Sequence, residues 1–588
     1  MKNSIRIGGG AGYSGDRIEP ARDLALRGKI DYLVFECLAE RTIALAQLSK
    51  LQDPEGGYDA LLEDRMRACL PTCQAKGIRV ISNMGAANPL AAARRTLQIA
   101  EELGLGSIKV AAVGGDDVLE FLQRDNYAFL ESDQTVDSIR SQMISANAYL
   151  GVEGIVDALH QGADVILTGR VADPALFLAP MIFEFGWSMN DYDLLGKGTT
   201  LGHLMECAGQ VTGGYFADPG YKDVKDLARL GFPIAEITPD GSFFISKLPD
   251  TGGQVTIKSC VEQLLYEIHD PATYLTPDVV ADFSKVHFEE VQKNKILVRG
   301  ATGRAPTGQL KVSVGYQEGY IGEGQISYGG SGAMNRAQLA LDIVRERLRM
   351  SGNSYTDCRF EIIGYNHLYG GALSSGEPAE VRIRVAAKTA DRSSAKRVGW
   401  EVEALYTNGP AGGGGAIKTV QEVIAIQSVL LDANLVKPSV SIERGQNQTT
   451  SPEGHLIATT AKEDHPPLPN TSTISKVQPL IPSPHLTLKS LAHSRTGDKG
   501  NIANISVIAY DKTNFSLLER ELTAEKVKDY LSEIVEGEVL RYALPQLGAL
   551  NFVLYNALAG GVTRSLALDK HGKTLSSTLL DMKLNVND

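Results

Sequence analysis

SIRIGGGAGYSGD, residues 4–16, is the stretch that decides the fold. A short β-branched run, Ser4–Ile7, enters a glycine-rich cluster directly, and a stretch with helical periodicity follows it. Strand, polar turn and helix in this order form the repeating unit of α/β proteins. Similar units recur through the first 170 residues. We therefore predict an α/β fold whose core is a parallel, Rossmann-like sheet with right-handed crossovers.

The predicted core strands are short and apolar on both faces, as buried parallel strands are. They cover Ser4–Ile7, Asp31–Phe35, Ile78–Ser82, Ile108–Val113 and Asp164–Thr168. The predicted helices between them cover Arg17–Arg27, Asp59–Lys76, Pro89–Leu103 and Ser138–Gln161. A mixed α+β extension follows, with strands at Lys295–Arg299, Leu310–Val314, Ala379–Ala386 and Gly399–Tyr406, and helices at Ala333–Met350 and Ala416–Leu431.

The composition of the chain changes near its C-terminal end. Residues 437–484 are rich in Pro, Ser and Thr and show little periodicity, which is typical of a linker. We expect a core domain over 1–436 before it and a small α+β domain over 485–588 after it. In the small domain we predict strands at Leu486–Ala492, Ile502–Tyr510, Asn551–Tyr555 and Ser565–Leu568, and a helix at Ala524–Ile534.

Composition excludes several classes of function. The net charge is −12 and no basic run occurs, which argues against nucleic acid or an anionic membrane as a partner. Six cysteines in 588 residues do not form a disulfide framework. The chain shows neither a signal peptide nor an apolar stretch long enough to span a membrane. We therefore expect a cytoplasmic protein.

Polar or glycine-rich clusters end all five predicted core strands. They cover residues 8–16, 36–41, 83–89, 114–117 and 169–174. The carboxyl ends of parallel strands meet at one edge of a sheet, where ligands bind in α/β proteins. Turn formation explains any single cluster, but it explains five in succession poorly. The candidate binding residues here are Gly9, Gly10, Gly12, Glu36, Asn83, Gly114, Asp116 and Arg170.

Two of these clusters allow alternative interpretations. Residues 10–15 match the dinucleotide pattern G-x-G-x-x-G, and Glu36 ends the next strand, but Asp16 would oppose a phosphate. A nicotinamide dinucleotide and another phosphate or carboxylate anion therefore both stay open. In the cluster 169–174, Arg170 offers a fork for an anion and Asp173 could accept a proton. The alternative is an internal ion pair, with Asp173 capping the following helix.

The sharpest local cluster is GHLMECAGQVTGGYFADPG, residues 202–220. On a helix His203, Glu206 and Cys207 share one face, where they could form an acid/base pair, a thiol activated by histidine, or metal ligands. Buried cysteine and hydrogen-bonded histidine are also common without any function. We expect no metal site. Further binding candidates follow at Gln210, Thr212, Gly213, Lys247, Thr251, Gly252 and Gly253.

Five motifs together resemble the acyclic terpene utilisation A (AtuA) family. They are IRIGGGAGYSGDRIEPA, LTGRVADPALFLAP, LGHLMECAGQVTGGYFADPG, SKLPDTGGQV and HSRTGDKGNIANISV. The resemblance covers the family's core over about 4–450 and its ferredoxin-like domain over about 485–585. It implies a role in the breakdown of acyclic terpenoids such as citronellol and geraniol, beside enzymes that handle CoA thioesters. An acyl-CoA or a branched acid is therefore the substrate that it implies.

These observations lead to one leading hypothesis and two alternatives. We predict a homo-oligomeric lyase- or hydrolase-type enzyme in which Asp173, His203, Glu206 and Cys207 are the catalytic candidates. We expect no cofactor, with CoA present only as part of the substrate. One alternative is an NAD(P)-dependent dehydrogenase. The other is a non-catalytic scaffold that associates with an acyl-CoA carboxylase through the small domain.

Overall fold

The computed structural model describes residues 2–368, 378, 380–444 and 487–584. Five parallel strands form the centre of its largest sheet, in the order β1-β2-β3-β6-β4. Their bounds are Ile5–Ala11 (β1), Tyr32–Phe35 (β2), Arg79–Ser82 (β3), Val165–Thr168 (β6) and Lys109–Gly114 (β4). All five predicted core strands are therefore confirmed, and their carboxyl ends share one edge of the sheet.

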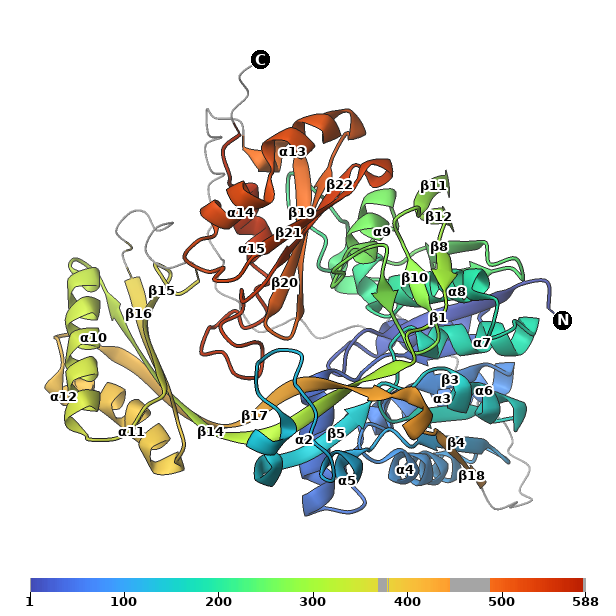
Figure 1. Cartoon of the computed structure of the whole chain (residues 1–588), viewed down its shortest axis with the longest axis horizontal. Coiled ribbons are helices and arrows are strands. Elements are labelled where there is room, and N and C mark those ends of the chain that lie inside the picture. Colours follow the sequence, from blue (N-terminus) through green and yellow to red (C-terminus); the bar gives the residue numbers. More distant parts are fainter. Residues whose placement is uncertain (1, 369–377, 379, 445–486, 585–588) are drawn as a thin grey trace, which may run out of the picture.

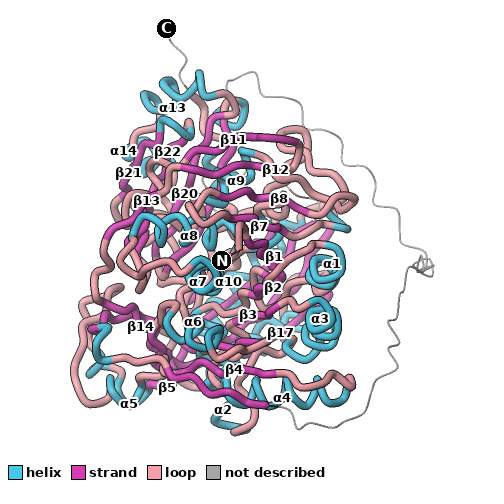
Figure 2. Tube along the Cα trace, turned by 90° about the vertical axis from the view of Figure 1, so that its right-hand side faces the viewer, coloured by secondary structure: helices cyan, strands magenta, loops and turns pink. Residues whose placement is uncertain are grey.

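Helices cover both faces of this parallel sheet, as Figure 2 shows. One layer contains α1 (Glu19–Arg27), α3 (Leu62–Lys76) and α4 (Pro89–Glu102), and the other contains α6 (Glu153–His160), α7 (Ala175–Phe185) and α8 (Tyr192–Met205). Neighbouring strand residues point to opposite layers, so Leu33 packs with the first and Val34 with the second. Burial on both faces explains why these strands are continuously apolar.

Antiparallel strands extend the sheet on both sides. Beyond β1 lie β7 (Pro233–Ile237), β8 (Phe243–Lys247), β12 (Lys295–Arg299) and β11 (His287–Gln292). Beyond β4 lies β18 (Ser439–Arg444), inside the segment predicted as a linker. That prediction is wrong for β18, because Val440 and Ile442 pack against the core. The rest of the predicted linker, 445–484, lies outside the described residues.

A long two-stranded ribbon connects the body to a separate lobe (Figure 1). It consists of β14 (Gln309–Gly329) paired with β17 (Gly414–Asp432), and β5 (Met143–Ala148) joins β14 at the body end. The lobe contains β15 (Asp357–Ile363), β16 (Glu380–Thr389), α10 (Ala333–Met350), α11 (Arg392–Glu403) and α12 (Leu405–Asn408). Smaller elements elsewhere are α2 (Glu40–Gln52), α5 (Leu119–Leu122), β9 (Tyr274–Leu275), β10 (Val280–Asp282) and β13 (Thr302–Arg304).

Three predictions of element type are wrong in this region and just before it. The predicted helix 138–161 contains the strand β5, and only its end forms α6. The predicted strand 399–406 lies in α11 and α12, because Asp391 caps a helix by accepting a hydrogen bond from the amide of Ser394. The predicted helix 416–431 is the strand β17, whose many β-branched residues favour an extended ribbon.

The small domain has a four-stranded sheet in the order β19-β20-β22-β21. Its elements are β19 (Ala492–Lys499), β20 (Ile502–Ala509), β21 (Val539–Leu544), β22 (Ala549–Leu554), α13 (Phe515–Glu521), α14 (Ala524–Tyr530) and α15 (Leu575–Leu580). The helices pack on one face. The other face contacts the core, where Asn504 and Asn551 donate hydrogen bonds to the carbonyls of Leu265 and Ile268. Helix α9 (Ile257–Leu264) lies at this interface.

Two predicted strands of the small domain are wrong. Residues 486–492 were expected to form a strand, but a short turn of 3-10 helix, Leu488–Ser490, precedes β19. The strand β19 begins only at Ala492 and continues to Lys499. Residues 565–568 form no strand in the described part of this domain. Among the described residues of the whole chain, no helix is both long and apolar enough to cross a membrane.

Candidate functional site

Glu36 follows β2 at the carboxyl edge of the parallel sheet. Its Oε1 accepts hydrogen bonds from Nδ2 of Asn83, which follows β3, and from the amide of Leu38, both at 2.9 Å. Asn83 in turn accepts a hydrogen bond from the amide of Cys37 at 2.7 Å, so it fixes the position of Glu36. Burial and the nearby charge of Asp173 raise the pKa of Glu36 to about 8. With such a pKa, most of the Glu36 carboxyl groups are protonated at pH 7.

Arg170 and Asp173 follow β6 and form an ion pair at 2.5 Å. The other arm of the guanidinium donates to the carbonyl of Leu38, and the group lies 4.0 Å from the ring centroid of Tyr149. Of the two interpretations of this cluster, the structure shows the internal ion pair between Arg170 and Asp173. Helix α7 begins after Pro174 without a side-chain cap, so Asp173 is not a capping residue. The side chain of Asp173 is 26% exposed.

Asp116, after β4, holds the loop that carries Arg170. Its carboxylate accepts hydrogen bonds from the amide of Arg170 at 2.9 Å and from Nδ2 of Asn147 at 2.8 Å. It also fills the space that a side chain at Gly169 would need. Burial raises the pKa of Asp116 to about 6. The space beside Gly114, by contrast, is open except for the hydroxyl of Ser439.

His203 and Glu206 share one face at the end of α8, as the spacing predicts. Nδ1 of His203 lies 2.8 Å from Oε1 of Glu206, and Nε2 lies 3.1 Å from the carbonyl oxygen of Leu264. Because a carbonyl can only accept, Nε2 carries a proton. The ring is 1% exposed and stacks on Phe283, so it positions Glu206 and does not face solvent. Burial and the charge of Asp173 raise the pKa of Glu206.

Cys207 lacks the environment of a nucleophile. Burial raises the pKa of its thiol, and the charge of Glu206 adds to this effect. Both ring nitrogens of His203 are engaged with other partners, so the expected activation of the thiol by histidine is absent. Its backbone instead packs against β1, where a Cβ at Gly12 would lie 2.7 Å from the Cα of Cys207.

The structure contradicts the dinucleotide interpretation of residues 10–15. Gly9 and Gly10 lie inside β1, where Cβ atoms would press on the carbonyl of Met205 and the ring of Phe35. The amide of Gly12 donates to the carboxylate of Asp16 at 3.0 Å, so a negative charge occupies the place of a pyrophosphate. These glycines allow close packing, and they do not form a phosphate-binding loop.

The candidate residues of the region 210–253 make contacts within the protein. Lys247 donates to the carbonyls of Leu248 and Thr251 and to the Thr251 hydroxyl, so its three N–H groups are in use. A side chain at Gly252 would overlap the carbonyl of Asp226. Thr212 donates to the carbonyl of Gly231, and Gly213 has a positive φ of 106°. Gln210 accepts a hydrogen bond from Arg495 of the small domain. The expected anion-binding turn is thus a set of internal contacts.

Several groups that the sequence interpretation missed lie near Asp173. Lys499, at the end of β19, pairs with Glu267 at 2.8 Å, and Lys311, in β14, pairs with Glu40 at 2.6 Å. Tyr149 donates to Glu40 at 3.1 Å. We call the whole set the charged cluster, and its members are Glu36, Glu40, Tyr149, Arg170, Asp173, Glu206, Glu267, Lys311 and Lys499.

The two lysines of the charged cluster are partly accessible to solvent. Lys499 and Lys311 keep 43% and 33% of their side-chain surface accessible. Burial lowers the pKa of both lysines. Nearby acidic groups, chiefly Glu267 and Glu40 respectively, together have the larger opposite effect, so the pKa of each lysine lies above its ordinary value. The members come from the core, from β14 and from the small domain.

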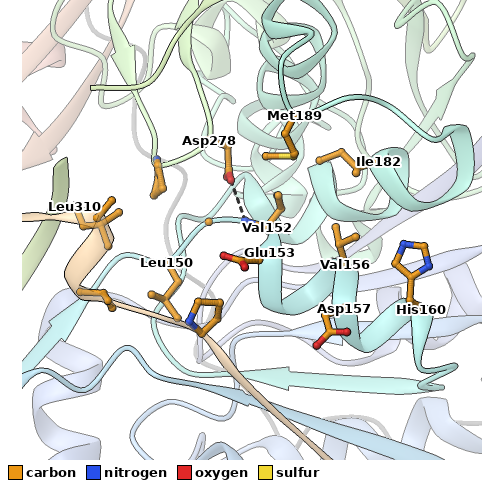
Figure 3. Close-up of a pocket in the computed structure, with 15 residues that line it drawn as sticks. Leu150, Val152, Glu153, Val156, Asp157, His160, Ile182, Met189, Asp278 and Leu310 are labelled. Carbon is orange, nitrogen blue, oxygen red and sulfur yellow. Dashed lines mark hydrogen bonds between the residues drawn. The ribbon is translucent and has the colours of Figure 1, made fainter. Parts of the chain in front are cut away.

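A cavity of about 550 Å³ lies elsewhere, beside α6 (Figure 3). Its lining is mostly apolar and includes Leu150, Val156 and Met189. Asp278 in its wall already accepts a hydrogen bond from the amide of Val152 at 3.1 Å. No predicted site residue lines this cavity. We therefore take the charged cluster, where titratable groups from several elements converge, as the candidate site. Among the described residues, no group of three or more His, Cys, Asp or Glu side chains is arranged to hold a metal ion.

Comparison with known proteins agrees with the motifs. No curated protein matches the sequence. A family model described as "Acyclic terpene utilisation family protein AtuA" matches residues 5–442. A second family model, described as "AtuA ferredoxin-like domain", matches residues 486–585. The first match covers the strand-end residues and the second covers the small domain with Lys499. The chain therefore belongs to the AtuA family of acyclic terpene utilisation proteins, and this membership implies involvement in the use of acyclic terpenes.

Proposed function

We propose that the protein is a catabolic enzyme that performs lyase- or hydrolase-type acid/base chemistry on a branched acyl-CoA or its acid. One arrangement carries the proposal. Two carboxyl groups lie at the carboxyl edge of the parallel sheet: Asp173 is paired with Arg170, and burial together with the charge of Asp173 raises the pKa of Glu36 to about 8. Two carboxyl groups in different protonation states supply an acid and a base at the same pH.

In the proposed reaction Asp173 accepts a proton from the substrate and Glu36 donates one to the departing group. Arg170 pairs with Asp173 and orients it, and Asn83 holds Glu36 in position. Glu206, held by His203, is a further carboxyl next to Asp173. A pair of this kind suits the removal of a proton next to a carbonyl group, followed by elimination or cleavage.

The two alternatives have less support. The occupied amide of Gly12 and the buried glycines of β1 disfavour a dinucleotide enzyme. A scaffold that docks through the small domain would leave the core site complete without that domain. The small domain instead contributes Lys499 to the charged cluster, which favours a catalytic role for both domains. An association with an acyl-CoA carboxylase is compatible with either function.

Turnover of a branched ten-carbon substrate tests the proposal. Purified full-length protein is incubated with 3,7-dimethyloct-6-enoate and with its CoA thioester, and mass spectrometry follows the product. Because a positioned acid or base contributes roughly 10²–10⁴-fold, Glu36→Gln and Asp173→Asn are expected to lose turnover on that scale. The control is Glu346→Gln on α10, whose carboxylate is 54% exposed in the distal lobe. Turnover that survives both site substitutions would contradict the assignment of acid and base.

A further inference from the structure

The small domain brings a second lysine to the charged cluster. Lys499 ends β19, and Lys311 lies in β14 of the core ribbon. Each ammonium group forms one ion pair, with Glu267 and with Glu40 respectively. An ammonium has three N–H donors, and among the described residues neither lysine makes a second hydrogen bond. Each therefore keeps donors for a ligand.

The two ammonium groups lie close enough to repel each other. The charge of Lys499 acts against the charge of Lys311. Together with burial, both lysines lower the pKa of the nearby His269 to about 4, so this histidine is neutral and adds no charge. Each lysine already has a carboxylate partner, and an anion bound between the two ammonium groups would reduce the repulsion that remains between them.

A small ligand has access to both lysines, whose side chains are 43% and 33% exposed. Asp173 also lies within electrostatic reach of Lys499. An anionic group held between the lysines would therefore bring the adjoining carbon of the same ligand toward the proposed base.

We propose that Lys311 and Lys499 together bind the carboxylate of a branched carboxylic acid, so that the small domain supplies half of the anion site of the enzyme. The two oxygens of a carboxylate match two ammonium donors. An amide or an alcohol of the same shape would offer these donors no charge-assisted hydrogen bond. The site thus selects the free acid over its neutral analogues. This inference rests on the proposed function, which it deepens by naming the form of the substrate.

Calorimetry with a matched pair of probes tests the inference on the full-length protein. The probes are 3,7-dimethyloctanoate and its neutral amide, 3,7-dimethyloctanamide, at pH 7.5 and low salt. The wild type is expected to bind the carboxylate at least about tenfold more tightly than the amide, as a charge-assisted hydrogen bond would give. Lys499→Gln and Lys311→Gln should each lose about tenfold or more in carboxylate affinity, with the amide affinity unchanged. Lys499→Arg should keep most of the carboxylate affinity.

The matched control is Lys526→Gln on α14, which removes an ammonium that is 49% exposed and pairs with Glu521. It should leave both affinities unchanged. Equal binding of the two probes by the wild type, no binding of either, or full carboxylate affinity in Lys499→Gln would overturn the inference. Asp173→Asn separates this result from the proposed chemistry, because that variant should lose turnover and still bind the carboxylate.

Discussion

Glu36 is a carboxyl group that destabilises the fold at neutral pH. Its folded pKa of about 8 lies above the ordinary value of 4.5. Below about pH 4 Glu36 is protonated in both the folded and the unfolded state, so it does not lower the free energy of unfolding. As the pH rises, the unfolded chain releases the proton first, and stability falls until the pH passes about 8. At pH 7 the burial of Glu36 lowers the free energy of unfolding by on the order of 3 kcal/mol.

We therefore expect Glu36→Gln to be inactive and more stable than the wild type. Glutamine keeps the acceptor for Asn83 and Leu38 and cannot ionise. Urea unfolding should show a gain in unfolding free energy on the order of 2–3 kcal/mol at pH 7 that disappears near pH 4. Glu40→Gln is the control of opposite sign. Burial raises the pKa of Glu40, but mainly Lys311 lowers it to about 2. The ionised Glu40 therefore stabilises the fold at neutral pH, and this stabilisation is lost in acid. A gain for Glu36→Gln that does not vary with pH would contradict the explanation.

Local spacing predicts only part of the charged cluster. Glu36 and Asp173 follow strands, and His203 and Glu206 are three residues apart on one helix, so each is visible in a short stretch of sequence. Lys311 lies near the start of β14 and gives no local signal. Lys499 is visible as part of a charged stretch, but its approach to Asp173 depends on how the two domains dock, which no local pattern encodes.

At the scale of elements, β1 and the short 3-10 helix η3 (Ala208–Gln210) approach each other at a glycine. A Cβ at Gly12 would lie 2.7 Å from the Cα and from the carbonyl oxygen of Cys207, which precedes η3. Gly12→Ala should therefore push the end of α8 away from the sheet edge and move Glu206. We expect a loss of about 2 kcal/mol in unfolding free energy and a marked fall in turnover.

Gly114→Ala is the matched control for this substitution. Gly114 is the last residue of the parallel strand β4, and a Cβ there would meet only the Ser439 hydroxyl, at 3.4 Å. Its unfolding free energy should change by less than about 0.5 kcal/mol, and its turnover should stay at the wild-type level. If both variants behaved alike, the close approach of Gly12 to Cys207 would not be important.

Periodicity predicts the core elements well and the ribbon poorly, for a physical reason. Core strands are buried on both faces and have one sequence pattern. The strand β17 runs from the lobe to the body, and its residues change along its length from exposed or partly exposed to mostly buried. Apolar residues then recur at spacings that also suit a helix. The β-branched residues Ile417, Val420 and Val423 were the available signal for a strand.

At the scale of the whole molecule, a buried charged contact ties the small domain to the core. Glu262 of α9 is 1% exposed and pairs with Lys222 at 2.7 Å and with Nδ1 of His493 in β19. His493 and Lys499 belong to the same strand, so this contact sets where Lys499 lies. In the proposed reaction the core domain supplies the acid and the base, and the docked small domain supplies a cation.

Removal of the charge of Glu262 should therefore loosen the small domain and weaken substrate binding together. Glu262→Gln leaves the ammonium of Lys222, only 8% exposed, without its counter-charge, which costs on the order of 3 kcal/mol. Hydrogen exchange should become faster in β19 and α9, and the affinity for 3,7-dimethyloctanoate should fall although Glu262 is not a member of the charged cluster. Glu521→Gln, which breaks an ion pair with the exposed Lys526, should change neither. Faster exchange in β19 with unchanged carboxylate affinity would mean that the position of the small domain does not control the anion site.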